Sequence, residues 1–356
     1  MIGILGGYGY VGIYATRFIK NYSKHKIRIG GRNFEKVDSK IREEFSDAEW
    51  MKVDAKKDED IDSFFSGCDC ILDATSLPHQ DVLRLDDFAQ QKQIPIVHLG
   101  LNGFEKANSN IPIIYGAGSI PGLSGLVPQY LAQTFDNVNE LEFCFGACGT
   151  MSPAAAKDYL DGICNAENKS MVYWNHGKLE PFIPSNSDYE FFDRKFSCYK
   201  LFPYFDEESA AVTNKTNAKI GRWQMCFAGR KILAELDRAR TNYKKDPQKT
   251  IEDFCTANRL DMFGEKEEAI FYCSISGTEN GMEKKKILRL SGIAPRENTG
   301  ETAAAAALAI LENKTENKKQ LLGESNLFNS VLQFITKDSR INLEIYDPEE
   351  ESEGEI

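Results

Sequence analysis

The sequence predicts an α/β fold in which an N-terminal doubly wound Rossmann domain is joined to a second, α+β domain built on an open, mostly antiparallel sheet. First, strand-like apolar segments alternate with helical ones through residues 1–100, as in parallel sheets with crossover helices. Second, a glycine-rich turn directly follows the first strand. Third, residues 123–295 lose this alternation, and strand-like segments outnumber helical ones there. A chain of 356 residues is long enough for two such domains.

The turn after the first strand has the spacing of a dinucleotide-binding motif. Gly7, Gly9 and Gly12 follow the pattern G-x-G-x-x-G between a strand and an amphipathic helix. The first glycine permits the sharp turn, the second lets a pyrophosphate approach the backbone, and the third lets the helix lie close to the strand. The amide groups and positive end of the helix then face the pyrophosphate. We therefore expect a dinucleotide to contact Gly7, Gly9, Tyr10, Val11 and Gly12; the alternative is a glycine turn without a ligand.

The end of the second strand distinguishes between the two nicotinamide cofactors. This strand covers residues 26–31 and ends about 20 residues after the glycine turn, where an NAD enzyme commonly carries Asp or Glu for the ribose 2′-hydroxyl. Here Arg32 and Asn33 follow the strand instead. A guanidinium pairs well with a 2′-phosphate, and the asparagine amide can donate to the same group. We therefore expect NADP, although Arg32 could stack on the adenine or be solvated, and Glu35 keeps NAD open.

Further strands and helices extend the alternation. In chain order we expect a helix at 33–45, a strand at 50–54, a helix at 60–65, a strand at 70–75, a helix at 82–91 and a strand at 94–100. Ligands of such sheets bind outside the carboxyl ends of the strands. Asp54 is therefore expected to accept a hydrogen bond from the adenine amino group. Ala74, Thr75 and Ser76, with residues 98–102, are expected nearest the nicotinamide.

Several motifs together resemble one family. Residues 6–12 (Gly-Gly-Tyr-Gly-Tyr-Val-Gly), 30–32 (Gly-Gly-Arg) and 73–78 (Asp-Ala-Thr-Ser-Leu-Pro) are similar to the NADP-binding domain of saccharopine dehydrogenase-like reductases. Residues 118–124 are similar to the Gly-x-x-Pro-Gly-Leu-Ser segment with which that family leaves its first domain. Residues 299–307 resemble the helix that returns from the second domain. The resemblance covers both ends of the chain, whereas the middle, roughly 150–290, fits only in outline.

The resemblance implies a domain organisation and a class of reaction. A dinucleotide-binding domain at 1–122, completed by 296–346, would enclose a substrate and dimerisation domain at 123–295 in the sequence. Members of the family reduce or oxidise carbon–nitrogen bonds of amino-acid-derived substrates, and some branches act on thioester-bound or lipid substrates. The acidic tail at 347–356 cannot bury apolar surface and is expected to be disordered; a solvated end is favoured over a docking tail.

The second domain is expected to be a sheet with few helices. Helices are expected at 127–135 and 152–160, strands at 140–145, 270–276 and 286–291, and a hairpin at 171–181, with 213–216 and 225–229 left unassigned. In the C-terminal portion that completes the first domain, we expect a helix at 324–335 and a short edge strand at 342–345. One face of such an open sheet can cover a nicotinamide, and the other often forms a homodimer.

Composition excludes several other classes of protein. The net charge of −11 and the pI near 5.1 argue against nucleic acid as a partner. No apolar run reaches the roughly 20 residues that span a bilayer, and the fold begins at residue 1, so we expect no signal peptide and a cytoplasmic location. The nine cysteines contain no Cys-x-x-Cys pair, so we expect buried thiols and no metal. Cys148, just after a strand, remains a candidate reactive cysteine.

The cofactor supplies the hydride, so the protein has to orient the substrate and supply one proton to it. Several residues are candidates for the proton donor. Of the histidines, His25 and His176 are expected at the surface, and His79 and His98 fall on the cofactor side. An imidazole there could protonate the nascent amine, or it could only hydrogen-bond the loops. Alternatives from the second domain are Lys157, Tyr159 and Tyr173, and an imine is so easily protonated that no dedicated acid is required. A substrate carboxylate could be held by Arg194, Arg222 or Arg230.

Three functions follow from these observations. The favoured one is NADPH-dependent reduction of an imine derived from an amino acid. The second is NADPH-dependent reduction of a carbon–carbon or carbonyl bond on a carrier-bound or lipid substrate. The third is a sensor or subunit that keeps the nucleotide site and has no turnover.

Overall fold

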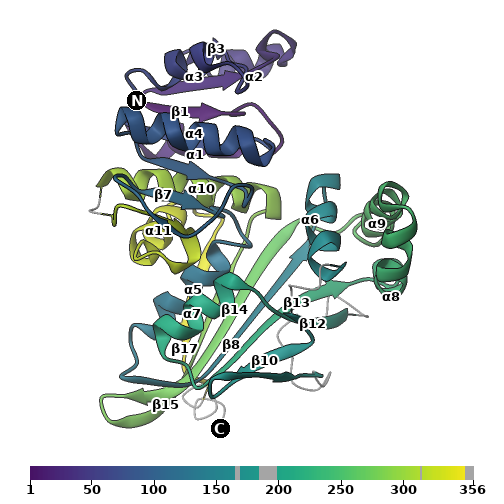
Figure 1. Ribbon diagram of the computed structural model, residues 1–356. Helices are drawn as coiled ribbons and strands as arrows, with labels where there is room; N and C mark the ends of the chain where they lie inside the picture. The colour runs from purple at the N-terminus through teal and green to yellow at the C-terminus, as the bar shows by residue number, and fades with distance from the viewer. Residues whose placement is uncertain (165–168, 184–198, 313–314, 349–356) are drawn as a thin grey trace. The chain divides into compact units, whose positions relative to one another are not determined.

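The computed structural model describes residues 1–164, 169–183, 199–312 and 315–348 (Figure 1). The chain forms two compact units. Unit 1 contains Met1–Leu126 and Arg296–Ile341, and unit 2 contains Val127–Pro295 and the segment that begins at Asn342. Each unit is built on its own β-sheet.

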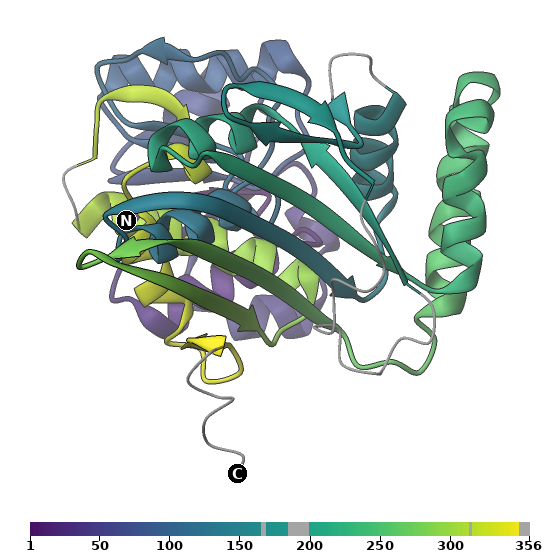
Figure 2. The same ribbon diagram turned by 90° about the horizontal axis from the view of Figure 1, so that it is seen from below.

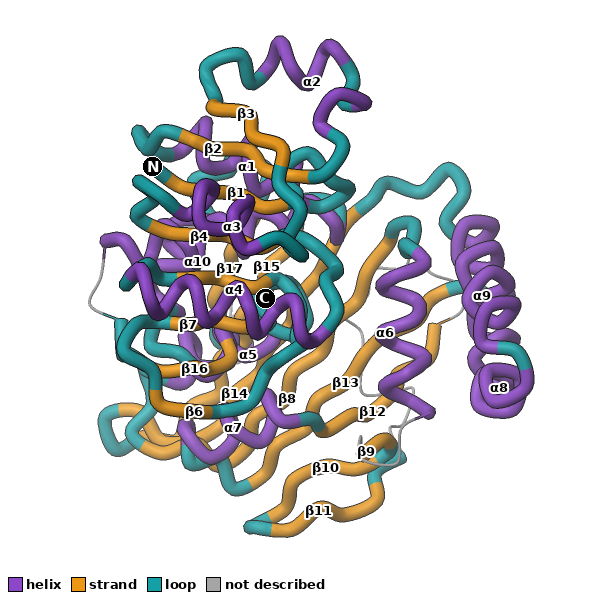
Figure 3. The backbone as a smooth tube through the Cα atoms, turned by 45° about the horizontal axis from the view of Figure 1, so that its top comes forward, coloured by secondary structure: helices purple, strands orange, loops and turns teal. Residues whose placement is uncertain are grey.

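Unit 1 contains an eight-stranded sheet in the order β3-β2-β1-β4-β5-β7-β16-β6 (Figure 3). Its strands are β1 (Ile2–Leu5), β2 (Ile27–Gly31), β3 (Glu49–Lys52), β4 (Cys70–Asp73), β5 (Ile96–His98), β6 (Ala107–Asn108), β7 (Ile113–Tyr115) and β16 (Lys318–Leu321). Every pair is parallel except β16 with β6. The strand order reverses at β1, which has β2 on one side and β4 on the other. In doubly wound sheets this switch point is where ligands bind.

Helices connect the strands of unit 1. They are α1 (Gly12–Tyr22), α2 (Ser39–Glu44), α3 (Asp58–Phe65), α4 (His79–Lys92), α10 (Pro295–Glu312) and α11 (Phe328–Ile335), with short 3₁₀ turns at Phe34–Lys36 and Leu322–Glu324. Helix α5 (Leu123–Ala132) contains the boundary between the units. The single helix predicted at 33–45 is wrong. The chain turns after the 3₁₀ segment, and α2 starts afresh with the Asp38 carboxylate accepting a hydrogen bond from the Lys40 amide.

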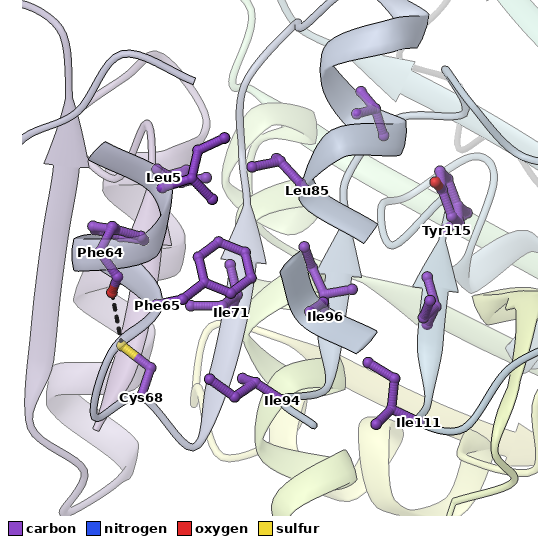
Figure 4. Close-up of a cluster of buried hydrophobic side chains, with 14 of the residues drawn as sticks. Leu5, Phe64, Phe65, Cys68, Ile71, Leu85, Ile94, Ile96, Ile111 and Tyr115 are labelled. Carbon is purple, nitrogen blue, oxygen red and sulfur yellow. Dashed lines mark hydrogen bonds between the residues drawn. The ribbon is translucent and has the colours of Figure 1, made fainter. Parts of the chain in front are cut away.

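One part of the core of unit 1 lies between the sheet and the pair α3 and α4. Phe64 and Phe65 of α3 and Leu85 of α4 are fully buried against Ile71 and Ile96 of the sheet (Figure 4). Replacing such a phenylalanine by alanine typically costs about 3–5 kcal/mol. Figure 3 places α3 and α4 in front of the sheet, with α1 and α10 behind it.

Helix α10 packs closely on α1 through small residues. A Cβ at Gly300 would lie 2.6 Å from the Val11 carbonyl oxygen, and the residues from Ala303 to Ala309 are buried. The alanine-rich segment is therefore a core helix of unit 1. In the described part of the chain, no helix has the length and apolar character needed to cross a membrane.

Unit 2 contains a nine-stranded sheet whose main path is β11-β10-β13-β8-β14-β15-β17, with β12 and β9 joined beside β13 (Figures 1 and 2). Its strands are β8 (Asn137–Cys148), β9 (Lys169–Ser170), β10 (Val172–Asn175), β11 (Lys178–Pro181), β12 (Tyr199–Phe205), β13 (Ile220–Ala228), β14 (Glu268–Glu279), β15 (Met282–Ser291) and β17 (Asn342–Tyr346). All pairs are antiparallel except β13 with β8. Both parts of the predicted fold class are thus confirmed.

The helices of unit 2 are more numerous than predicted. They are α6 (Pro153–Cys164), α7 (Glu207–Thr216), α8 (Arg230–Lys245) and α9 (Pro247–Asp261). Helix α6 was predicted, and its cap is as expected, since the Ser152 hydroxyl accepts a hydrogen bond from the Ala155 amide. Helices α6, α8 and α9 share a buried apolar cluster that contains Leu160, Ile232 and Phe254. The paired helices α8 and α9 have no counterpart in the prediction.

One segment changes the predicted domain boundaries. We expected 296–346 to complete the first domain, but β17 pairs with β15 and so belongs to unit 2. The expected edge strand at 342–345 is confirmed, whereas its assignment to the first domain is wrong. Residues 349–356 of the predicted acidic tail lie outside the described residues.

Candidate functional site

The turn between β1 and α1 leaves no room for a side chain at its glycines. Gly6 has a positive φ of 74°, and its amide donates to the Gly30 carbonyl of β2 at 2.8 Å. The Gly9 amide donates back to the Gly6 carbonyl, also at 2.8 Å. A Cβ at Gly12 would lie 2.2 Å from that same carbonyl oxygen. Glycine is therefore required at 12, where the helix starts against the turn.

A buried threonine fixes this turn to the helix. The Thr16 hydroxyl lies 2.7 Å from the Gly7 carbonyl oxygen and 2.9 Å from the Gly12 carbonyl oxygen. Its side chain is fully buried. Sequence reasoning missed Thr16; a hydroxyl one helical turn after the third glycine is the signal that could have indicated it.

The amides at the start of α1 are available to a ligand. Those of Ile13 and Tyr14 donate to carbonyls within the turn. Those of Tyr10, Val11 and Gly12 have no acceptor among the residues that the structure describes. The first turn of α1 contains no acidic side chain. Three donors at the positive end of a helix, free of a competing carboxylate, form an anion-binding arrangement.

The predicted phosphate-binding residues lie at the end of β2. Arg32 and Asn33 are both exposed, and Arg32 forms no ion pair with any described residue. The Asn33 amide donates to the Tyr8 hydroxyl at 3.1 Å, which connects this loop to the glycine turn. Asp54 follows β3 and accepts a hydrogen bond from the Lys56 amide at 3.1 Å.

The loop after β4 packs directly on the glycine turn. The Ala74 amide donates to the Leu5 carbonyl at 2.9 Å, and a Cβ at Gly6 would lie 2.9 Å from the Ala74 carbonyl oxygen. Thr75 is half-buried and Ser76 exposed. The structure therefore brings the predicted residues after β1 and β4 together at the switch point.

His98, at the end of β5, is the centre of a buried charged network. Its Nδ1 lies 3.0 Å from Asp73 Oδ2, and its Nε2 lies 2.9 Å from Asp86 Oδ1. The ring stacks on Tyr115 at a centroid distance of 4.5 Å. The other oxygen of Asp86 accepts from the Tyr115 hydroxyl at 2.8 Å and pairs with Lys319 Nζ at 2.5 Å. We call these five residues the His98 network.

The two carboxylates determine the charge of His98. Burial opposes the imidazolium, yet the hydrogen bonds to Asp73 and Asp86 raise the pKa of His98 to about 9. Although burial also opposes its ionisation, the pKa of Asp86 is lowered by His98 and Lys319. Burial and Asp86 raise the pKa of Tyr115. At neutral pH His98 is therefore a cation, held between Asp73 and Asp86.

The two histidines expected near the nicotinamide have different surroundings. His98 is 1% exposed and both of its ring nitrogens face carboxylates. This geometry favours a structural role over the proton-donor role that the sequence suggested. His79 is exposed at the first residue of α4, with no hydrogen-bond partner among the described residues.

The candidates from the second domain are mostly engaged elsewhere. Lys157 pairs with Asp161, the Tyr173 hydroxyl donates to Glu180 at 3.2 Å, and Tyr159 packs on Phe227 with ring centroids 4.8 Å apart. Burial raises the pKa of Tyr159.

The arginines proposed for a substrate carboxylate also differ. Arg222 forms an ion pair with Glu140 and lies over the ring of Tyr173, whereas Arg230 is exposed at the start of α8. Arg194 lies outside the described residues.

The described residues contain no group arranged for metal binding, and the candidate reactive cysteine is buried. Within residues 1–164, 169–183, 199–312 and 315–348, no group of three or more His, Cys, Asp or Glu side chains is arranged to hold a metal ion. The Cys148 thiol is buried, 3.5 Å from the Met262 sulfur.

Taken with the sheet order, the glycine turn defines unit 1 as a Rossmann-type fold. Comparison with solved structures agrees over most of the chain. Apo histidine-tagged saccharopine dehydrogenase (L-Glu forming) from Saccharomyces cerevisiae superposes with a TM-score of 0.61 at 12% identity, covering 97% of this chain and 99% of that one. The chain therefore has a saccharopine dehydrogenase-like fold.

Two further solved structures are less similar. The C. glutamicum DAP dehydrogenase in complex with DAP has a TM-score of 0.45 at 12% identity, with 95% and 98% coverage. A short-chain dehydrogenase/reductase from Veillonella parvula in complex with NADP has a TM-score of 0.25 at 14% identity, over 27% of this chain and 45% of that one. No family model matches the sequence, and no curated protein matches it by sequence.

Proposed function

We propose that this protein is an NADPH-dependent oxidoreductase that reduces the carbon–nitrogen double bond of an imine derived from an amino acid. The proposal depends chiefly on one observation: the Gly7–Gly12 turn lies at the switch point of a saccharopine dehydrogenase-like fold. Three amides of this turn have no hydrogen-bond acceptor among the described residues. The yeast protein with this fold is an L-glutamate-forming saccharopine dehydrogenase, which supports an amino-acid-derived substrate.

The residues of the turn fit a dinucleotide diphosphate. The absent side chain at Gly12 lets α1 begin against the turn. Tyr10, Val11 and Gly12 supply the amides that bind the diphosphate, and the helix dipole favours its negative charge. No carboxylate in the first turn of α1 opposes it.

Other residues bind the remaining parts of the cofactor. The guanidinium of Arg32 and the side-chain amide of Asn33 would bind the 2′-phosphate. Asp54 accepts from the adenine amino group, and Ala74, Thr75 and Ser76 line the nicotinamide end. When bound, the cofactor supplies the hydride.

Protonation of the amine nitrogen needs at most one side chain of the protein. His79 is exposed near the carboxyl end of β4 and is the candidate donor to the amine nitrogen. An imine is already easily protonated, so we expect His79 to accelerate the reaction without being essential.

A substrate panel tests this function. NADPH oxidation should occur when an amino acid and a 2-oxo acid are supplied together, or with a preformed cyclic imine. A Gly12→Ala variant, which lacks the diphosphate site, is the control and should be inactive. If NADPH is oxidised only with acyl-pantetheine substrates, the imine proposal is wrong and the protein reduces a carrier-bound substrate. Tight NADPH binding without turnover of any substrate would indicate a sensor.

Two further properties complete the proposal. We expect a homodimer formed through the sheet of unit 2, which sedimentation of the purified chain can measure. We also expect a cytoplasmic location, which fluorescence microscopy of a tagged chain can check.

A further inference from the structure

Tyr8 connects the glycine turn to the end of β2. Its hydroxyl accepts a hydrogen bond from the Asn33 amide at 3.1 Å. Its ring stacks on Trp50 of β3, with the centroids 6.1 Å apart and the planes inclined by 25°. The indole of Trp50 is itself fixed, because its Nε1 donates to the Phe45 carbonyl at 3.1 Å. Tyr8 is therefore held in one position beside the loop that contains Arg32.

The ring of Tyr8 occupies the space of a side chain at Gly31. A Cβ at Gly31 would lie 2.3 Å from the Tyr8 hydroxyl oxygen and 2.6 Å from its Cζ. Gly31 is not among the glycines with a positive φ, so its backbone conformation admits other residues. The tyrosine ring, and not the backbone, is what a side chain at position 31 would meet.

Position 31 bears on the choice between NAD and NADP. Gly31 is the last residue of β2, and an acidic side chain at the end of this strand is what accepts from the ribose 2′-hydroxyl of NAD. With Tyr8 in place, no such carboxylate fits at 31. Where NAD would require an acceptor, the structure presents the hydroxyl of Tyr8.

The Tyr8 hydroxyl has a proton to give. A phenol hydroxyl can donate one hydrogen bond and can also accept one. The Tyr8 hydroxyl oxygen accepts its hydrogen bond from the backbone amide of Asn33. Its own proton has no acceptor among the described residues. A 2′-phosphate provides acceptor oxygens, and hydrogen bonds to a charged acceptor are the stronger kind.

We propose that Tyr8 is a specificity-determining residue of the nucleotide site: its ring excludes an acidic side chain at 31, and its hydroxyl donates to the 2′-phosphate beside Arg32. This inference rests on the proposed function, because it assumes that the glycine turn binds a dinucleotide. It adds a neutral donor to a site for which sequence reasoning indicated only Arg32 and Asn33.

Binding of two nucleotide fragments to the full chain tests the inference. 2′,5′-ADP carries the 2′-phosphate, and ADP lacks it. The unmodified chain should prefer 2′,5′-ADP. Tyr8→Phe keeps the ring and removes the hydroxyl, so it should weaken 2′,5′-ADP about tenfold and leave ADP unchanged. Tyr22→Phe, at the last residue of α1, is the matched control and should change neither.

A second variant tests the steric part. Gly31→Ala must displace the tyrosine ring, so it should also lower the preference for 2′,5′-ADP; its melting temperature reports whether it folds. A preference that survives Tyr8→Phe unchanged would overturn the role of Tyr8 and leave the proposed function intact. Failure of the unmodified chain to bind either fragment would overturn the proposed function together with this inference.

Discussion

His98 Nδ1 lies 3.0 Å from Asp73 Oδ2, and this hydrogen bond joins the ends of two neighbouring strands. The other oxygen of Asp73 accepts hydrogen bonds from both the amide and the hydroxyl of Thr75. Thr75 in turn belongs to the loop that packs on the glycine turn. The charge of His98 is therefore connected, through one carboxylate, to the loop that we expect to line the nicotinamide.

The first prediction concerns stability at alkaline pH. The pKa of His98 is raised from 6.5 to about 9 in the folded chain. Its stabilising contribution is thus fully present below pH 6.5 and is lost as the pH rises through about 9. The difference amounts to ~3 kcal/mol in the free energy of unfolding. Denaturant unfolding at pH 6 and pH 9.5 measures it.

The matched comparison for this prediction uses another histidine. A His98→Gln variant should lose most of the pH dependence between these two values, whereas His176→Gln, at an exposed turn, should keep it. An unchanged pH dependence in His98→Gln would show that other groups cause it.

The second prediction concerns the other carboxylate of the network. Asp86→Asn leaves Lys319 without its anion and His98 with one carboxylate instead of two. Breaking a buried ion pair in this way costs about 3–5 kcal/mol. The free energy of unfolding should fall accordingly, and an NMR titration should report a lower pKa for His98.

An exposed ion pair between α3 and α4 provides its control. Asp62→Asn removes the partner of Lys92 at a solvated site, where we expect a loss of at most about 1 kcal/mol. Equal losses in the two variants would mean that the buried network has no special contribution.

The third prediction concerns the glycine turn. A methyl group at Gly12 would lie 2.2 Å from a backbone oxygen that cannot move without opening the turn. Gly12→Ala should therefore abolish NADPH binding and destabilise the fold by more than about 1 kcal/mol. Thermal unfolding and fluorescence titration measure the two effects. Gly100→Ala, where a Cβ meets nothing within 4 Å, should leave the unfolding temperature unchanged; a comparable loss there would remove the steric explanation.

The sequence predicted those helices and strands whose patterns lie within a short stretch of the chain. The glycine spacing, the apolar strands and the loss of alternation in the second half each depend on neighbouring residues, and they predicted both sheets. Sequence reasoning missed the strands β6, β7 and β16 of unit 1 and β12 of unit 2. It also missed the paired helices α8 and α9, which are stabilised by burial against α6.

The arrangement of the site depended on contacts between distant residues. His98 is 25 residues from Asp73 and 12 from Asp86, so its surroundings are set by the sheet and α4. One signal was available, because Asp73 and His98 end adjacent strands and are partners in register. The role of Tyr8 depends on the direction of its ring, which no sequence pattern encodes.

We expect Arg32, beyond β2, to select the cofactor that carries a 2′-phosphate. Fluorescence titration of the unmodified chain and of Arg32→Ala with NADPH and with NADH tests it most directly. We predict that the variant binds NADPH about 10- to 100-fold more weakly while its affinity for NADH changes by less than about twofold. Equal weakening of both cofactors, or no binding of either by the unmodified chain, would contradict this account.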